Sequence, residues 1–248
     1  MDRDRHRRHY TSGVRATKFE FERRFWIFCA FYFAGFGLSA FDHVSFPTWL
    51  RQLFGIPGNS AQALTFARVV ILIGAVLVFI AAALRTWGAA YLRTSIVHDT
   101  DQHSEAIVAD GPFRYTRNPL YLASVLMAIG IGVLASRTGF VFLVLANWIF
   151  VYRLIFREEE TLRSSQGVHY RSYYDSVPRF WPSLRTRLAP SSHSPQWAQA
   201  FAGETFVWLY GVAVLAIAIS LNVRLGLILF AAGFLAHFTI TRWIQRRG

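Results

Sequence analysis

The sequence is poor in cysteine and in compact groups of metal-binding side chains. Its single cysteine, Cys29, lies within an apolar run. One chain can therefore form no disulfide, no zinc site built on several thiolates and no cysteine pair for redox chemistry. The eight histidines do not form HExxH or another compact ligand pattern. We therefore expect a packed thiol at Cys29 and no bound metal.

Acidic residues are also scarce, since 14 Asp and Glu face 26 Lys and Arg, and the net charge is +12. In a soluble protein such an excess would suggest nucleic-acid binding. Here 54% of the residues are apolar, and they come in blocks with most basic residues between them. This distribution is typical of membrane proteins, whose basic residues gather on the cytosolic side. We therefore expect a membrane partner and no nucleic acid.

The apolar blocks predict an all-α, polytopic membrane bundle with about six spans. Several blocks are shorter than the ~20 residues that cross a bilayer, so they need flanking residues or a tilt. No internal repeat or coiled-coil heptad is evident. The predicted spans are residues 25–41, 67–84, 119–136, 139–156, 206–221 and 225–240.

Polar segments divide the chain into four predicted parts. The basic stretch 1–24 is too long for the charged region of a signal peptide, so we interpret it as a cytosolic tail. A membrane core, 25–182, ends in a cytosolic segment, 157–182. A linker, 183–200, and two further spans in 201–248 follow. With the amino terminus in the cytosol, the inside segments hold 22 of the 26 Lys and Arg, so we expect both termini to be cytosolic.

One motif, GPFRYTRNPLY at residues 111–121, stands where a polar segment meets a span. Asn118 before Pro119 predicts a helix N-cap followed by the first helical residue. The first backbone N–H groups of that helix would face water beside Arg114 and Arg117, an arrangement suited to an anion. The anion could belong to a ligand, or to lipid phosphates at the membrane surface.

A second motif follows a predicted helical hairpin that turns near Arg137. Glu158 lies about as far beyond this turn as Asn118 lies before it, so antiparallel helices should bring Glu158 and Glu159 close to Arg117. Carboxylates beside hydrocarbon are costly without partners. They could be part of a site, or an acidic helical turn that pairs with nearby arginines.

Five linked elements make the sequence resemble the isoprenylcysteine carboxyl methyltransferase and phospholipid methyltransferase group. The likeness extends back to Leu84-Arg85-x-Trp87 and covers about 100 residues. Its elements are the motif at 111–121, the membrane hairpin, Glu-Glu-x-x-Leu at 158–162, Gly-x-x-Tyr-x-x-x-Tyr at 167–174 and Val-Pro-Arg-Phe-Trp-Pro at 177–182.

The resemblance implies an integral membrane enzyme that uses S-adenosylmethionine and methylates a lipid or other hydrophobic acceptor at the cytosolic face. The sequence has no GxGxxG after a strand, in agreement with a compact pocket rather than a dinucleotide-binding domain. Carried over by position, the cofactor-binding residues are Glu105, Ala106, Ile107, Val108, Phe113, Asn118, Pro119, Leu120, Tyr121 and Glu158. The candidate catalytic residues are Arg117, Glu159 and Tyr121, and the candidate acceptor-binding residues are Arg153 and Arg157.

Physical chemistry suggests roles for several of these residues. Glu158 could pair with the cationic sulfonium or ammonium of the cofactor, and Phe113 or Tyr121 could pack on its adenine or sulfonium. The chain departs from the family pattern at Asn118, where the group often has His, and at Leu154, which occupies the place of a substrate-facing Arg between Arg153 and Arg157. An NADPH-dependent membrane reductase of the sterol type and a non-catalytic scaffold remain alternatives.

Overall fold

The computed structural model describes residues 14–58, 61–98, 109–186, 188 and 194–245. These residues form helices and no named strand, as the sequence predicts, and one isolated antiparallel bridge joins Ser45 to Ser136. The elements are α2 Lys18–Glu22, α3 Arg24–Gly37, η1 Leu38–Ala40, α4 Phe46–Leu53, α5 Ala61–His98, η3 Gly111–Arg114, α6 Pro119–Gly132, α7 Arg137–Ser176, α8 Trp197–Ser220 and α9 Val223–Gln245.

Three described stretches are long and apolar enough to cross a membrane: Ala61–Leu92, Arg137–Gly167 and Trp197–Ser220. Three shorter apolar helices accompany them, at Arg24–Ala40, Pro119–Gly132 and Val223–Ala236. Each of the six predicted spans thus coincides with an apolar helix, and the chain is a membrane protein. That all six cross the bilayer stays a prediction.

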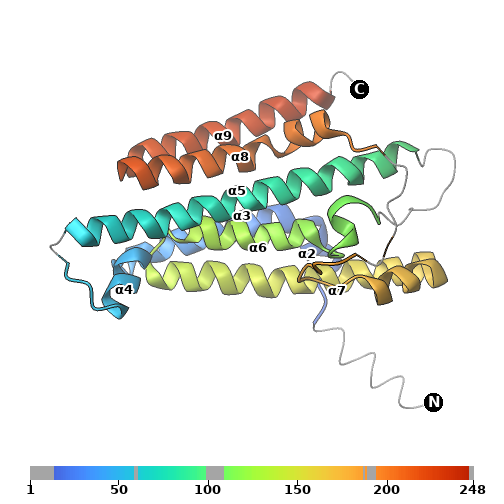
Figure 1. Ribbon diagram of the computed structural model, residues 1–248, viewed down its shortest axis with the longest axis horizontal. Helices are drawn as coiled ribbons and strands as arrows, with labels where there is room; N and C mark the ends of the chain where they lie inside the picture. The colour runs from blue at the N-terminus through green and yellow to red at the C-terminus, as the bar shows by residue number, and fades with distance from the viewer. Residues whose placement is uncertain (1–13, 59–60, 99–108, 187, 189–193, 246–248) are drawn as a thin grey trace, which may run out of the picture.

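The helices lie nearly parallel, with α5 through the middle of the bundle (Figure 1). One face of α5 packs on α6, which packs on α7, and α3 lies against α7. The opposite face packs on α8, which in turn packs on α9. The motif at 111–118 lies at one end of this bundle, called the motif end below, and α4 lies at the other end (Figure 1).

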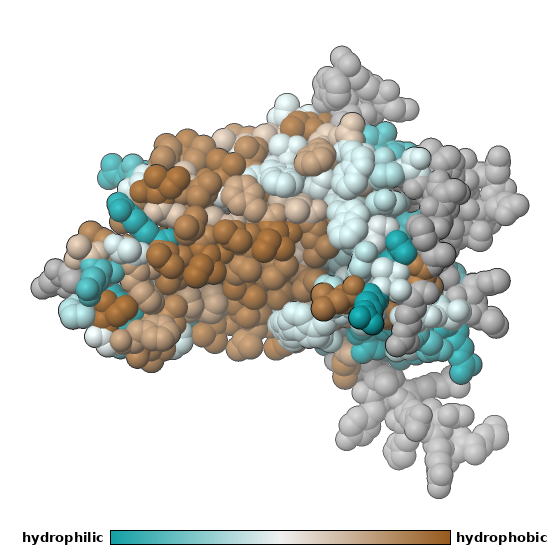
Figure 2. Space-filling view, in the orientation of Figure 1, coloured by the Kyte–Doolittle hydropathy of each residue, from teal (hydrophilic) through white to brown (hydrophobic). Residues whose placement is uncertain are grey.

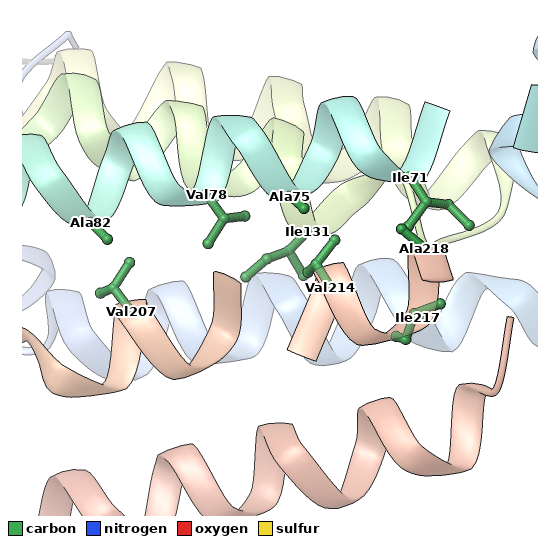
Figure 3. Packing of buried hydrophobic residues seen from close by; sticks show 9 residues of the cluster. All are labelled: Ile71, Ala75, Val78, Ala82, Ile131, Val207, Val214, Ile217 and Ala218. Carbon is green, nitrogen blue, oxygen red and sulfur yellow. The ribbon is translucent and has the colours of Figure 1, made fainter. Parts of the chain in front are cut away.

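The largest buried cluster joins α5, α6 and α8 through small and branched aliphatic side chains (Figure 3). Small residues allow the backbones of membrane helices to approach closely. Van der Waals packing then stabilises the helix pair, because the hydrophobic effect does not favour helix association within lipid. Its members are Ile71, Ala75, Val78, Ala82, Ile131, Val207, Val214, Ile217 and Ala218.

The outer surface agrees with a membrane environment. Hydrophobic residues cover the middle of the visible face, and hydrophilic residues gather toward its ends (Figure 2). Large apolar side chains such as Phe33 and Phe41 are exposed. In a bilayer these side chains would contact lipid rather than water.

The structure adds helical residues outside two of the predicted spans. The stretch 42–66 contains α4, because Ser45 accepts a hydrogen bond from the N–H of Thr48 and Pro47 suits a first helical turn. The predicted span 139–156 lies within a longer helix, α7, which continues to Ser176. Its backbone breaks helical geometry only at Gly167, where φ is 53°. The hairpin turn near Arg137 is confirmed, since α6 ends at Gly132 and α7 begins at Arg137.

Candidate active site

The site begins with an ion-pair cluster that joins the two motifs. Glu159 of α7 is 5% exposed and accepts hydrogen bonds from two arginines. Arg117, just before α6, approaches it with N···O distances of 2.9 and 3.1 Å. Arg179, in the loop after α7, approaches its other oxygen at 3.0 Å. The predicted meeting of the two motifs is confirmed.

Arg117 also anchors the chain that follows α7. Its guanidinium donates to the carbonyl of Val177 at 2.9 Å and to that of Tyr174, and it lies 3.8 Å from the centre of the Tyr174 ring. Its backbone N–H donates to the carbonyl of Pro178 at 2.9 Å. Such a forked set of contacts uses the planar geometry of arginine. Arg117 is therefore engaged with the protein. The sequence had instead predicted that it would lie beside water, where it could bind an anion.

Arg114 is likewise turned toward the protein. It donates to the carbonyl of Leu188 at 3.1 Å and to the hydroxyl of Thr186 at 2.9 Å. The segment beyond α7 is thus tied to η3. Both arginines thus bind protein atoms and do not form the anion site that the sequence predicted beside them.

The helix that follows the first motif begins where the sequence predicts, with Asn118 at the N-cap position and Pro119 as the first helical residue, but the Asn118 side chain does not cap it. Asn118 is buried and its Nδ2 donates to the carbonyl of Arg179 at 2.9 Å, with no cap hydrogen bond to α6. The Thr116 hydroxyl donates to the carbonyl of Phe180 at 2.9 Å. The side chains at 116 and 118 therefore fasten the 179–180 loop.

Tyr121 and Glu158 form a second pair beside the ion-pair cluster. The Tyr121 hydroxyl donates to Oε1 of Glu158 at 2.7 Å. Within the described residues, no Lys, Arg or His approaches the Glu158 carboxylate to within 4.0 Å. Two adjacent carboxylates thus differ in surroundings, because Glu159 has two cationic partners and Glu158 has a neutral phenol.

Glu158 and Tyr121 line a cavity of about 1330 Å³ that extends along the bundle. Side chains from α3, α5, α6, α7, α8 and α9 form its mostly apolar walls. At the motif end it reaches the predicted site residues Phe113, Arg117, Asn118, Pro119, Leu120, Tyr121 and Glu158. At the opposite end it reaches Ser45, Pro47 and Thr48.

The other predicted site residues lie elsewhere. Glu159 is absent from the cavity lining. Arg153 pairs with Glu20 at 2.8 Å, and Arg157 donates to the carbonyl of Ala16 at 3.0 Å, so both hold the N-terminal segment against α7. The predicted cofactor contacts Glu105, Ala106, Ile107 and Val108 fall outside the described residues.

Burial keeps two tyrosines behind the ion-pair cluster neutral. It raises the pKa of Tyr170 to about 12, and the neighbouring Glu159 charge adds to this effect. Burial also raises the pKa of Tyr173, whose hydroxyl donates to the carbonyl of Phe113 at 2.9 Å. Both phenols are therefore neutral at neutral pH, and Tyr173 keeps its hydrogen bond to the Phe113 carbonyl. Tyr170, Tyr173 and Val177 form a buried cluster in this segment.

The cavity has polar wall residues that the sequence did not assign to a site. Tyr32, Tyr210 and Asn147 line it, as does Arg85, which pairs with Glu204 of α8 at 2.6 Å. The sequence feature that could have identified them is a polar or ionisable residue within an apolar span, which commonly marks a functional site. Asn147 makes no hydrogen bond to another described helix, since its Nδ2 donates to the carbonyl of Leu143 in its own helix.

Comparison with known proteins places this site in a family context. Residues 69–167 match the family model of phospholipid methyltransferases. The cobalt-zinc-cadmium resistance protein CzcN of Cupriavidus metallidurans is 23% identical over 133 residues, which are 52% of this chain and 57% of that protein. The nickel-cobalt-cadmium resistance protein NccN of Alcaligenes xylosoxydans xylosoxydans is 24% identical over 170 residues, 67% of this chain and 76% of that protein.

No solved structure matches the chain. The family match begins within α5 and ends at the Gly167 break, so it contains η3, α6, the hairpin turn and both carboxylates. It therefore confirms the resemblance drawn from the sequence motifs. Over residues 69–167, this chain is thus similar to the phospholipid methyltransferase family of membrane methyltransferases.

Proposed function

We propose that this chain transfers a methyl group from S-adenosylmethionine to a lipid or other hydrophobic acceptor at the cytosolic face of the membrane. One observation supports this most directly: a long apolar cavity ends at a carboxylate, Glu158, that forms no ion pair within 4.0 Å with the described cationic side chains. A lipid-like molecule fits the apolar walls, and a cationic group fits the carboxylate.

The residues at the motif end suit S-adenosylmethionine chemically. When bound, this cofactor supplies a methyl group on a cationic sulfur. Glu158 could hold its sulfonium or ammonium group through charge and hydrogen bonding, and the Phe113 ring could pack on its flat or cationic parts. We retain Asn118, Pro119 and Leu120 as further contacts because they line the same end of the cavity. The family-implied contacts at 105–108 remain part of the proposal.

The cavity suits the acceptor through its size and its walls. Its volume of about 1330 Å³ exceeds the ~300–1,000 Å³ of ordinary small-molecule pockets. Burial of an apolar chain against these walls supplies binding free energy remote from the reacting atoms, which can be used to orient them. We infer that the reacting end of the acceptor lies at the motif end and its apolar part extends toward α4.

Tyr121 and Glu158 are the groups we assign to the reaction centre. The Tyr121 hydroxyl fixes the direction of the carboxylate through its 2.7 Å hydrogen bond. An amine acceptor must lose a proton, and this pair lies where the proton could be accepted. A carboxylate acceptor needs no proton removal, and there the same pair would orient the reactants away from water.

Arg117 and Glu159, predicted as catalytic, are proposed as positioning residues. Their ion pair holds the start of α6 against α7, and Arg179 joins the following loop to the same carboxylate. We assign Arg153 and Arg157 to the N-terminal segment rather than to the acceptor, because their guanidinium groups contact Glu20 and Ala16.

The relatives named for metal resistance suggest metal binding as a different function. The described residues contain no group of three or more His, Cys, Asp and Glu placed to hold a metal ion. Methyl transfer remains the function that we propose, because residues 69–167 match the phospholipid methyltransferase family model.

The test uses the purified full-length chain, labelled S-adenosylmethionine and a membrane lipid extract, with mass spectrometry of the products. Glu158→Gln removes the carboxylate charge and should weaken cofactor binding about 10- to 100-fold, the scale of a hydrogen bond to a charged group. Glu160→Gln is the matched control, because Glu160 is an exposed carboxylate on the same helix that pairs with Arg15. It should bind and methylate like the native chain.

Three results would contradict the proposal. Native activity in Glu158→Gln would remove this carboxylate from the site. Binding of NADPH without S-adenosylmethionine binding would favour a sterol-type reductase. Binding of neither cofactor would favour a scaffold.

A further inference from the structure

The wall of the cavity contains a buried hydrogen-bond acceptor without a partner. Asn147 of α7 is 1% exposed and lines the cavity. Its Nδ2 donates to the carbonyl of Leu143 at 2.8 Å, while its Oδ1 has no hydrogen-bond partner in the part of the chain that the structure describes. Exchanging the amide nitrogen and oxygen would place two acceptors against each other at Leu143. The unpartnered atom is therefore the oxygen.

A second unpartnered group belongs to Tyr32 of α3, a residue that also lines the cavity. The hydroxyl of Tyr32 is buried and has no hydrogen-bond partner within the described residues. It lies at the level of Asn147, because the contacts of α3 with α7 on either side of Tyr32 reach residues on either side of Asn147. These contacts are Phe28 with Phe150, whose ring centres are 5.2 Å apart, and Gly35 with Leu143.

Leaving such groups unsatisfied is unfavourable, and more so where water is excluded. An unpaired buried donor or acceptor has lost its hydrogen bonds to water without a replacement. Asn147 Oδ1 can only accept and the Tyr32 hydroxyl can donate, so the two together would complement a single small polar group.

We propose that the middle of the cavity recognises a hydroxyl group carried within the apolar body of the acceptor. A hydroxyl can donate to Oδ1 of Asn147 and accept from the Tyr32 phenol at the same time. The ester carbonyls of ordinary phospholipids accept only, so they leave Asn147 unpaired. An ammonium group would bring a charge into the bundle interior, which is unfavourable.

The position of the pair sets where the hydroxyl must lie. Asn147 precedes Glu158 by 11 residues on α7, which corresponds to ~16 Å along a helix. The acceptor is therefore a lipid with a hydroxyl well down its chain, far from the end that is methylated. This inference rests on the proposed function for the direction in which the acceptor lies, while the binding of a mid-chain hydroxyl can be measured without any methyl transfer.

The experiment measures lipid binding to the full chain in nanodiscs by native mass spectrometry, without cofactor. Two phosphatidylethanolamine probes are compared, one with a stearoyl chain and one with a hydroxystearoyl chain whose hydroxyl lies near the middle. The native chain should prefer the hydroxylated probe about three- to tenfold, the scale of one net hydrogen bond. Asn147→Leu and Tyr32→Phe should each lose most of this preference.

The control variant is Tyr152→Phe, which removes a phenol hydroxyl on α7 that does not line the cavity. It should keep the preference. Equal binding of the two probes by the native chain would overturn the inference, as would an unchanged preference in both Asn147→Leu and Tyr32→Phe. A preference that these two variants abolish, in a chain that fails to bind S-adenosylmethionine, would support the hydroxyl site and contradict the proposed function.

Discussion

Glu158 and Glu159 are neighbours in the sequence, but their side chains leave α7 toward different partners. Glu159 lies between Arg117 and Arg179, and Glu158 accepts from Tyr121 at the cavity. The motifs alone predicted that carboxylates and arginines would meet, because the hairpin geometry is readable from the sequence. Which carboxylate faces the cavity depends on side-chain directions in the folded bundle. The hairpin geometry does not give these directions, and only the family resemblance singled out Glu158 as a cofactor contact.

The role of Arg117 can be tested by a conservative substitution. Arg117→Lys keeps the charge but cannot donate to Glu159, Tyr174 and Val177 together. We expect a loss of about 2 kcal/mol in stability, measured as a lower thermal midpoint in detergent. Arg157→Lys is the control, since one donor and one charge suffice for its contact with Ala16. If Arg117→Lys melted like the native chain and lost only activity, Arg117 would be catalytic instead.

The N-terminal helix α2 should respond to acid. Its Glu20 closes a capping box with Thr17, whose N–H donates to the carboxylate at 2.6 Å. This bond, helped by Arg153, holds the pKa of Glu20 below its ordinary value of 4.5. A carboxyl whose pKa is lower in the folded state stabilises the fold above the unfolded value, and this contribution disappears as pH falls through the folded pKa.

Hydrogen exchange at residues 14–23 measures this response. We expect slow exchange at about pH 6 and a specific loss of protection at about pH 3, after correction for the intrinsic rate. In Glu20→Gln the protection should be weaker at the higher pH and change little with acid. Equal acid sensitivity in the native chain and this variant would show that another group is responsible.

At the scale of elements, the apolar helices were predictable and the polar ends were not. The cores of α3, α5, α6, α7, α8 and α9 coincide with apolar runs. The sequence analysis identified 157–176 only as part of a cytosolic segment, because this polar stretch contains no apolar run that would indicate a long helix. Contacts that form only on folding stabilise this stretch. The Tyr173 hydroxyl donates a hydrogen bond to the Phe113 carbonyl, and Arg117 donates one to the Tyr174 carbonyl. Local sequence patterns do not reveal such long-range partners.

Close approach of α5 and α6 depends on two glycines. A Cβ added at Gly74 would lie 2.6 Å from the Gly130 carbonyl oxygen, and one added at Gly130 would lie 2.6 Å from the Gly74 carbonyl oxygen. Either Gly→Ala change must therefore separate the two backbones, at a cost of about 1–3 kcal/mol. Gly37→Ala is the matched control, because its added Cβ would meet nothing within 4 Å. Thermal melting in detergent would refute this packing if Gly74→Ala and Gly37→Ala behaved alike.

At the scale of the whole molecule, the distribution of basic residues predicts the orientation of the bundle. The motif end should face the cytosol, and α4 should face the other side. In a Cys29→Ser background, a cysteine introduced at the exposed Arg171 should react with a membrane-impermeant thiol reagent only from the cytosolic side. A cysteine at the exposed His43 should react only from the opposite side. The reverse labelling pattern would invert the predicted topology and move the proposed site out of the cytosol.

The sequence resemblance covered the membrane core but assigned no role to the last two helices. The structure gives them one, because Phe206, Tyr210, Phe230 and Phe234 of α8 and α9 close a side of the cavity. That contribution could not be read from the motifs, since these residues are ordinary aromatic side chains in apolar runs. Their placement follows only from the packing of α8 on α5.

The Arg85–Glu204 ion pair has a consequence for biosynthesis. Its two residues are separated by 119 positions and lie within two helices of membrane length. During synthesis α5 enters the bilayer long before α8 has been translated, so a growing chain carries an uncompensated guanidinium at the edge of the hydrocarbon. Among the described residues, the carboxylate that neutralises it arrives with α8. A chain truncated before α8 would therefore expose the unpaired Arg85 charge, which cellular quality control can recognise. In the full-length chain Glu204 neutralises this charge.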